Sequence, residues 1–155
     1  MVSPELLRRY PFFGAFDEAE VGDIAMIAEE AFYQAGDPVF EVDQPATALY
    51  VLVEGSVEIW FVAMDKHEPE LRKEFYVSEF NPGDVFGISA LIEPYIYTMT
   101  ALVTSATRLI RIDGLELRHL CQLDPKMEAA VMRRLAKAAM DRLHDTRVQL
   151  LAARA

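Results

Sequence analysis

The chain has 155 residues and a mass of 17.5 kDa, which is enough for one domain with a hydrophobic core. Hydrophobic residues make up 52% of the sequence and charged residues 26%, a balance typical of a folded protein rather than a disordered one. The formal net charge of −10 at pH 7 argues against a nucleic-acid partner, because binding to the phosphate backbone requires a basic face.

The sequence indicates a protein of a reducing compartment with no membrane partner. Cys121 is the only cysteine, which excludes an internal disulfide. Arg8 and Arg9 interrupt the apolar residues near the N-terminus, so no signal-peptide core forms there. No apolar run approaches the length of a membrane span. We therefore expect a soluble, cytoplasmic protein.

Residues 1–30 are predicted to form helices. Ser3 precedes Pro4 in the pattern of an N-cap followed by the first helical residue. Further on, Asp17 and Glu20 have the spacing of a capping box, and the apolar residues that follow recur at helical intervals.

Residues 31–113 are predicted to form a β-barrel. Short runs rich in β-branched and aromatic residues are separated by Gly, Pro, Asp and Asn, which is typical of an antiparallel sandwich or barrel. Glu54 and Gly55 have the composition of a tight hairpin turn, and MDKHEPE that of a longer, solvated one. Gly36, Gly55 and Gly83 are predicted to adopt positive φ and to serve the fold rather than a ligand.

Residues 114–155 are predicted to form helices again. Asp113 precedes a short helix that runs through about Leu120, and Asp124-Pro125 starts a long one. Cationic residues make the long helix basic within an acidic protein, which allows electrostatic contact with a partner: Lys126, Arg133, Arg134, Lys137, Arg142 and Arg147.

Two apolar stripes run along this long helix. One set is predicted to pack on the barrel: Met127, Val131, Leu135 and Ala138. The other repeats at spacings of three and four residues and is predicted to form the seam of a homodimer: Ala129, Met132, Ala136, Ala139, Leu143, Thr146 and Leu150. The alternative is a monomer in which one broad stripe lies flat on its own domain.

Several short motifs, in order, resemble those of the cyclic nucleotide-binding domain family. They are AGDPVFEVDQPATALY, VLVEGSVEIW, NPGDVFG and ATRLIRID, and the similarity extends over roughly Leu7 to Leu151. The resemblance implies a single domain over residues 1–155, mainly β, with an antiparallel double-stranded β-helix (jelly roll) between N-terminal helices and a long C-terminal helix. It also implies a short cassette helix over residues 87–92, a regulatory function, and a dimer seam on the long helix.

The family's phosphate-binding cassette reads F-G-E-x-A-L and then R-(S/T)-A-T. Its Glu holds the ribose hydroxyl and its Arg pairs with the cyclic phosphate. Phe86, Gly87, Ala90 and Leu91 match this frame, but Ile88 stands at the Glu position and Tyr97 at the Arg position. Losing two charge-assisted contacts costs about 3–6 kcal/mol, or roughly a hundredfold to ten-thousandfold in affinity. We therefore predict that cyclic AMP and cyclic GMP do not bind in the conventional mode.

Two interpretations of the degenerate cassette remain. In the favoured one, Ile88, Met99 and Tyr97 fill the pocket. In the other, the pocket holds a less anionic ligand through the N–H groups at the helix start and the hydroxyls of Ser89, Tyr97, Thr98 and Thr100. Arg108 and Arg111 alternate with apolar residues and are predicted to face solvent, which makes them poor replacements for the missing arginine.

Catalysis finds little support in the sequence. His67 falls in the long hairpin turn, while His119 and His144 fall in C-terminal helices, so no strand-borne metal site is expected. Cys121 has no adjacent base and is predicted to be buried. We expect no enzyme activity and no cofactor. We also expect no DNA-binding segment, because the chain ends with the long helix; the partners would be a second copy or a protein effector.

Overall fold

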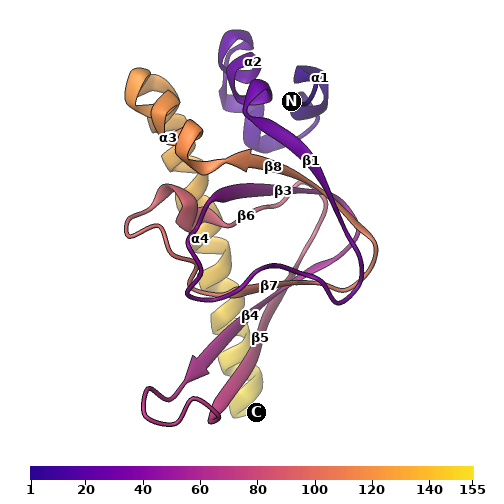
Figure 1. Ribbon diagram of the computed structural model, residues 1–155, viewed down its shortest axis with the longest axis vertical. Coiled ribbons are helices and arrows are strands. Elements are labelled where there is room, and N and C mark those ends of the chain that lie inside the picture. The colour runs from indigo at the N-terminus through magenta and orange to yellow at the C-terminus, as the bar shows by residue number, and fades with distance from the viewer.

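The computed structural model describes residues 1–155 as two four-stranded sheets with helices at both ends (Figure 1). The first sheet has the order β1 (Ala28–Tyr33), β8 (Thr107–Asp113), β3 (Ala48–Glu54), β6 (Val85–Phe86). The second has the order β2 (Pro38–Phe40), β7 (Thr100–Val103), β4 (Val57–Met64), β5 (Arg72–Phe80). All pairings are antiparallel, so the predicted jelly roll with flanking helices is confirmed.

The N-terminal helices start where their capping residues predict. Helix α1 (Pro4–Arg8) begins after Ser3, whose side chain accepts a hydrogen bond from the Leu6 amide. A 3₁₀ turn, η1 (Pro11–Ala15), leads to α2 (Glu18–Met26). The capping box is present: the Glu20 amide donates to Asp17 at 2.8 Å and the Asp17 amide donates to Glu20 at 2.9 Å.

The predicted boundary between the helices and the barrel is wrong by three residues, because β1 already begins at Ala28. Ala28, Glu29 and Glu30 pair with β8 in antiparallel register. The two glutamates favour a helix locally, but each forms an ion pair across the ladder: Glu30 with Arg108 at 3.1 Å, and Glu29 with Arg111 at 3.8 Å. Tertiary pairing therefore overrides local helix propensity here.

The predicted turn glycines are confirmed. Gly36, Gly55 and Gly83 have φ values of 93°, 105° and 94°. At Gly55 a β-carbon would lie 2.6 Å from the Thr107 Cα, so the turn has no room for any side chain. The strands on either side of the longer turn, β4 and β5, extend beyond the barrel and run beside the end of the C-terminal helix (Figure 1).

The C-terminal helices are α3 (Gly114–Leu123) and α4 (Pro125–Arg154). Helix α3 continues past the expected end near Leu120, because Asp124 both ends it and caps α4 by accepting from the amides of Lys126 and Met127. The set predicted to pack on the barrel is confirmed at Met127, Val131 and Leu135, which are fully buried. Leu143 and Leu150 on the other stripe are about half exposed, at 50% and 54%, and the dimer stays a prediction.

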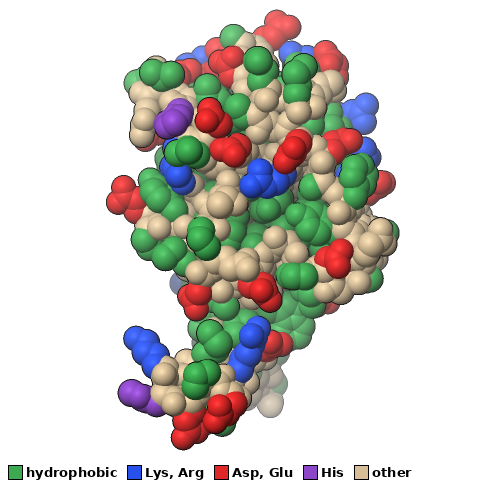
Figure 2. All heavy atoms as spheres, in the orientation of Figure 1, with side chains coloured by type: hydrophobic (Ala, Val, Ile, Leu, Met, Phe, Trp, Pro, Cys, Tyr) green, Lys and Arg blue, Asp and Glu red, His purple; other side chains and the backbone are tan.

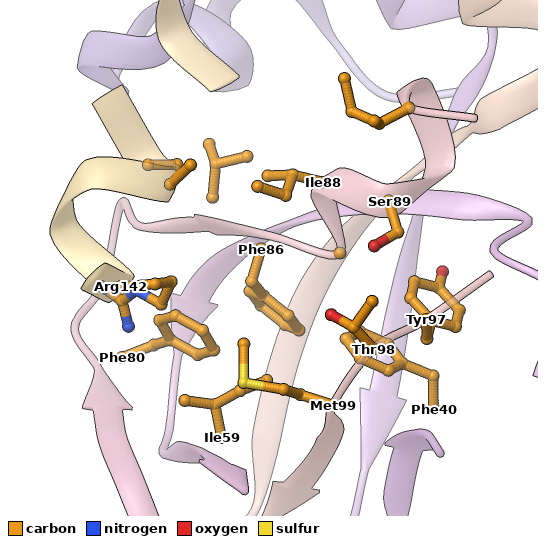
Figure 3. A pocket seen from close by; sticks show the side chains of 15 residues that line it. Phe40, Ile59, Phe80, Phe86, Ile88, Ser89, Tyr97, Thr98, Met99 and Arg142 are labelled. Carbon is orange, nitrogen blue, oxygen red and sulfur yellow. The ribbon is translucent and has the colours of Figure 1, made fainter. Parts of the chain in front are cut away.

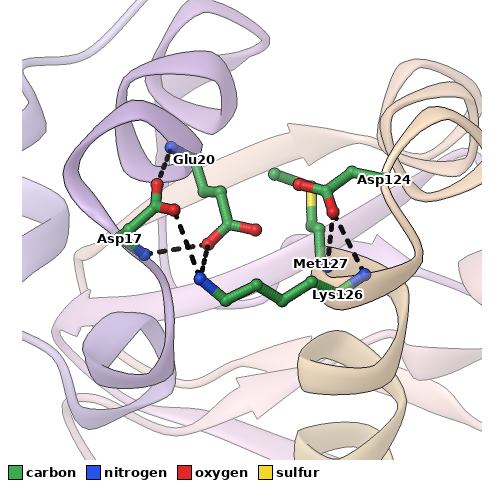
Figure 4. A network of polar contacts seen from close by, with 5 residues as sticks. All are labelled: Asp17, Glu20, Asp124, Lys126 and Met127. Carbon is green, nitrogen blue, oxygen red and sulfur yellow. Dashed lines mark hydrogen bonds and ion pairs between the residues drawn. The ribbon is translucent and has the colours of Figure 1, made fainter.

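A polar network joins the start of α4 to α2 (Figure 4). The Lys126 ammonium lies 3.4 Å from Asp17 and 3.9 Å from Glu20. Only 6% of the Glu20 side chain is exposed, and its Oε2 atom makes no hydrogen bond. Because one continuous core also runs from Leu7 and Phe13 through the barrel to Val131, the helices at both chain ends are fixed to the sheets.

Candidate ligand pocket

The cassette begins at a backbone position that only glycine fits. Strand β6 ends at Phe86, and Gly87 follows with φ of 76°, in the left-handed region. A β-carbon at Gly87 would meet the Ala48 carbonyl oxygen at 3.0 Å and the Tyr50 ring at 3.2 Å. The predicted cassette helix is present but shorter than 87–92: it is a single 3₁₀ turn, η2 (Ile88–Leu91), with Gly87 as its N-cap.

A cavity of about 280 Å³ lies between η2, the β2–β7–β4–β5 sheet and α4 (Figure 3). Its walls are mostly hydrophobic and aromatic, formed by Phe40, Ile59, Phe80, Val85, Phe86, Gly87, Ile88, Ser89, Ile92, Tyr97, Thr98, Met99, Ala138, Ala139 and Arg142. The favoured interpretation is therefore wrong in expecting a filled pocket, although Tyr97 is part of the core as that interpretation predicted. Ile88 and Met99 line the space without closing it.

Tyr97 leaves the cavity open because its side chain is fixed to the wall. Its hydroxyl donates to the Ala48 carbonyl at 2.7 Å and accepts from the Ala48 amide at 3.3 Å. Its ring stacks on Phe40 with the centroids 3.7 Å apart. Only 3% of the residue is exposed, and this burial raises the pKa of the phenol. The hydroxyl suggested as a ligand donor is thus already paired inside the chain.

Some of the other predicted cassette residues face the cavity and the rest do not. Ser89 and Thr98 direct their hydroxyls toward the cavity (Figure 3). Ala90 and Leu91 are buried in the core instead. Thr100 lies outside the cavity, where its hydroxyl accepts a hydrogen bond from the Val42 amide at 3.1 Å. The structure thus gathers the first part of the cassette and residues 97–99 around one space.

Helix α4 supplies a wall of the cavity that the cassette motifs do not predict. Ala138, Ala139 and Arg142 line the cavity, and Arg142 is the only charged residue that does so. The Arg142 guanidinium lies 4.6 Å from the centre of the Phe80 ring and donates to the Ser78 hydroxyl at 2.6 Å. A signal for it was available, because Arg142 comes four residues after Ala138 on the barrel-facing stripe. Ala139, assigned to the dimer seam, also borders the cavity.

Helix α3 contacts the cassette through the side chain of Arg118. Arg118 donates to the Ala90 carbonyl at 2.7 Å, and its guanidinium lies 3.9 Å from the centre of the Tyr95 ring. Arg118 therefore joins the cassette to α3, whereas Arg142 on α4 contacts Ser78 and Phe80 of β5.

The arginines of β8 do not reach the pocket. Arg108 pairs with Glu30 and with Glu54, the latter at 3.3 Å, and Arg111 pairs with Glu29. Neither lines the cavity, which agrees with the prediction that they cannot replace the cassette arginine.

Other functional features are few. Cys121 is buried as predicted, and burial raises the pKa of its thiol to about 11. No group of three or more His, Cys, Asp or Glu side chains is placed to hold a metal ion. None of the helices combines the length and the apolar character that crossing a bilayer requires.

Comparison with known proteins identifies the family to which this fold belongs. Residues 30–124 match the sequence profile described as the cyclic nucleotide-binding domain. The chain belongs to this family. The crystal structure of a candidate cyclic nucleotide-binding protein from Geobacter metallireducens GS-15 is 34% identical, with a TM-score of 0.80 over 93% of this chain and 100% of that one.

Two curated relatives are longer than this chain. A candidate potassium channel protein from Rhodopseudomonas palustris is 28% identical over 82% of this chain and 29% of its own length. A CRP-like cAMP-activated global transcriptional regulator from Mycobacterium tuberculosis is 24% identical over 86% of this chain and 57% of its own length. The chain thus spans less than two thirds of either relative.

Proposed function

We propose that this domain senses a small molecule in the cavity beside η2, and that the ligand is not cyclic AMP or cyclic GMP bound in the conventional mode. One observation carries the proposal: the cavity is open, yet the two cassette positions that would hold a cyclic nucleotide are Ile88 and Tyr97. The membership of a family of regulatory domains supports the sensing role.

The contacts around the cavity support the exclusion of conventional nucleotide binding. Ile88 offers no acceptor to a ribose hydroxyl, and an unpaired buried polar group costs about 1–3 kcal/mol. Tyr97 carries no charge for a phosphate, and its hydroxyl is paired with Ala48. With both anchors absent, the affinity falls by roughly a hundredfold to ten-thousandfold.

We propose that a bound ligand acts on other proteins through α4. This helix has three faces: one packs on the barrel, one carries the apolar stripe from Ala129 to Leu150, and one is basic. Ala139 belongs to the stripe and also borders the cavity. A ligand that shifts α4 therefore changes the surface offered to a second copy or to a protein effector.

A second candidate function is a regulatory scaffold without a ligand. Tyr97 favours it, because a residue at a ligand-binding position has become part of the core. In that case the domain acts only through its protein contacts, and the cavity is a packing gap.

Calorimetry and thermal shift separate these functions. We expect no binding of cyclic AMP, cyclic GMP or cyclic dinucleotides in the micromolar range, and tight binding of any of them would overturn the proposal. A metabolite present at a hundred times its dissociation constant should add about 2.7 kcal/mol of stability. The variant Ala138→Phe, which fills the cavity, should remove that shift. If no metabolite stabilises the parent protein, the scaffold function is favoured.

A further inference from the structure

We infer that the cavity binds a compact aromatic or aliphatic monocarboxylate whose anionic group is held by Arg142 on α4. The inference rests on the proposed sensing function and names its ligand class. In this arrangement the positive group that holds the anion lies on the C-terminal helix. It does not lie in the cassette, where Tyr97 stands at the position expected for an arginine.

The walls favour a flat apolar body. The rings of Phe80 and Phe86 stack with their centroids 4.7 Å apart, and those of Phe40 and Tyr97 stack at 3.7 Å. Aromatic surfaces of this kind pack well against planar groups. The volume of about 280 Å³ lies just below the roughly 300–1,000 Å³ usual for small-molecule pockets, which limits the ligand to a compact molecule.

Arg142 can bind an anion without losing its present contacts. A guanidinium has five N–H donors in a planar fork. One donates to Ser78, and Nη2 lies 3.3 Å from the Asp145 carboxylate, which leaves three donors for a ligand. The Phe80 ring below and the Ser78 hydroxyl fix the orientation of the fork. An arginine held in this way is suited to a carboxylate.

The charge of the wall selects an anion over a cation. No carboxylate lines the cavity, and Arg142 is its only charged residue. The chain as a whole carries a net charge of −10, so an anion needs a local positive group in order to bind at all. A neutral ligand would use the apolar walls but leave the free donors of Arg142 to water.

The polar groups lie at two ends of the space. Figure 3 shows Arg142 on one side of Phe86 and Met99, with Ser89 and Thr98 on the other. An acid bound with its carboxylate at Arg142 would therefore direct its apolar body past Phe86. A polar substituent at its far end would meet the Ser89 and Thr98 hydroxyls.

A matched pair of probes tests the inference. Naphthalene-2-carboxylate and 2-naphthalenemethanol share one ring system and differ in the anionic group. Calorimetric titration of the parent protein should show the acid binding at least tenfold more tightly. Arg142→Gln should weaken the acid by about 10- to 100-fold, the usual worth of a charge-assisted bond, and leave the alcohol unchanged. Arg142→Lys, which keeps the charge, should retain part of the difference in affinity between the acid and the alcohol. Ala138→Phe, which fills the cavity, should abolish binding of both probes.

Three results would overturn the inference. The first is equal affinity for acid and alcohol, and the second is an Arg142→Gln variant that binds the acid as the parent does; both leave the sensing function in place with a neutral ligand. The third is no binding of either probe, which removes this ligand class. Failure of the sensing function itself appears separately, as the absence of any stabilising metabolite or as tight binding of a cyclic nucleotide.

Discussion

The Tyr97 hydroxyl and the main chain of Ala48 form a reciprocal contact, in which the hydroxyl donates to the carbonyl at 2.7 Å and accepts from the amide of the same residue. The motif spacing in the sequence predicts Tyr97 at the cassette position of the phosphate-binding arginine. The contact joins the segment before β7 to the first residue of β3 and places the phenol in the wall. A residue at a position expected to bind ligand therefore holds two parts of the fold together.

Replacing Tyr97 by Phe should destabilise the fold without changing its response to cyclic nucleotides. The substitution leaves the Ala48 carbonyl and amide without their partner, which costs about 1–3 kcal/mol. Urea denaturation measures the loss. Tyr76→Phe is the matched control, because the Tyr76 side chain is partly exposed and should change stability little. Equal stability of the two variants would contradict the structural role assigned to Tyr97.

Gly87 should tolerate no side chain, for two reasons that a paired experiment separates. Its φ of 76° costs a non-glycine residue about 1–2 kcal/mol, and a β-carbon would also press on the Ala48 carbonyl oxygen at 3.0 Å. Gly36 has φ of 93° but no atom within 4 Å of an added β-carbon. We expect Gly87→Ala to lose more stability than Gly36→Ala in thermal denaturation. Equal losses would show that the backbone conformation alone matters.

The network of Figure 4 should give the fold a pH-dependent stability. The Asp17 amide lowers the pKa of Glu20, but burial and the neighbouring Asp124 carboxyl outweigh it, so the pKa is raised above its ordinary value of 4.5. An acid whose pKa is raised on folding penalises the folded state while it is ionised. The penalty is fully present above the folded pKa and is relieved as the pH falls toward 4.5.

The variant Glu20→Gln tests this sign. Glutamine keeps the acceptor for Asp17 and removes the charge. The stability of the parent should therefore rise relative to Glu20→Gln as the pH is lowered from 8 to 5, in melting temperatures taken on both proteins. Glu18→Gln is the control, because the Glu18 side chain is 91% exposed and its variant should follow the parent. A constant difference between parent and Glu20→Gln would contradict the raised pKa.

Local signals in the sequence were enough to place most elements. The caps at Ser3, Asp17, Asp113 and Asp124 mark the helix starts, because a side-chain acceptor there pairs with amides within the next turn. The turn glycines mark the hairpins for an equally local reason. The early start of β1 was missed, because the partners of Glu29 and Glu30 lie on β8, far along the chain.

Whether the pocket is open or filled also depends on contacts between residues that are far apart in the sequence. Whether Tyr97 fills the cavity or lines it is decided by its hydrogen bonds to Ala48 and its stacking on Phe40, neither of which is visible in the spacing of the cassette. The sequence marks Arg142 only as one of the cationic residues of the long helix, which were expected to contact a partner. Its place over Phe80 requires the position of α4 against β5.

The apolar stripe of α4 should hold two copies of the chain together. Leu143 on the stripe is half exposed in a single chain. Figure 2 shows that one face of the molecule also carries hydrophobic side chains between the main body and the projecting hairpin. Burying a leucine contributes about 1.5–3 kcal/mol, and a dimer buries two copies of it, so Leu143→Glu should weaken association by roughly a hundredfold or more. Light scattering coupled to size exclusion, over a range of concentrations, measures the mass. His144→Glu, one residue further on and on the basic face, introduces the same charge and should leave the dimer intact. A parent protein that stays monomeric at high concentration, or a Leu143→Glu variant that dimerises like the parent, would rule out this seam.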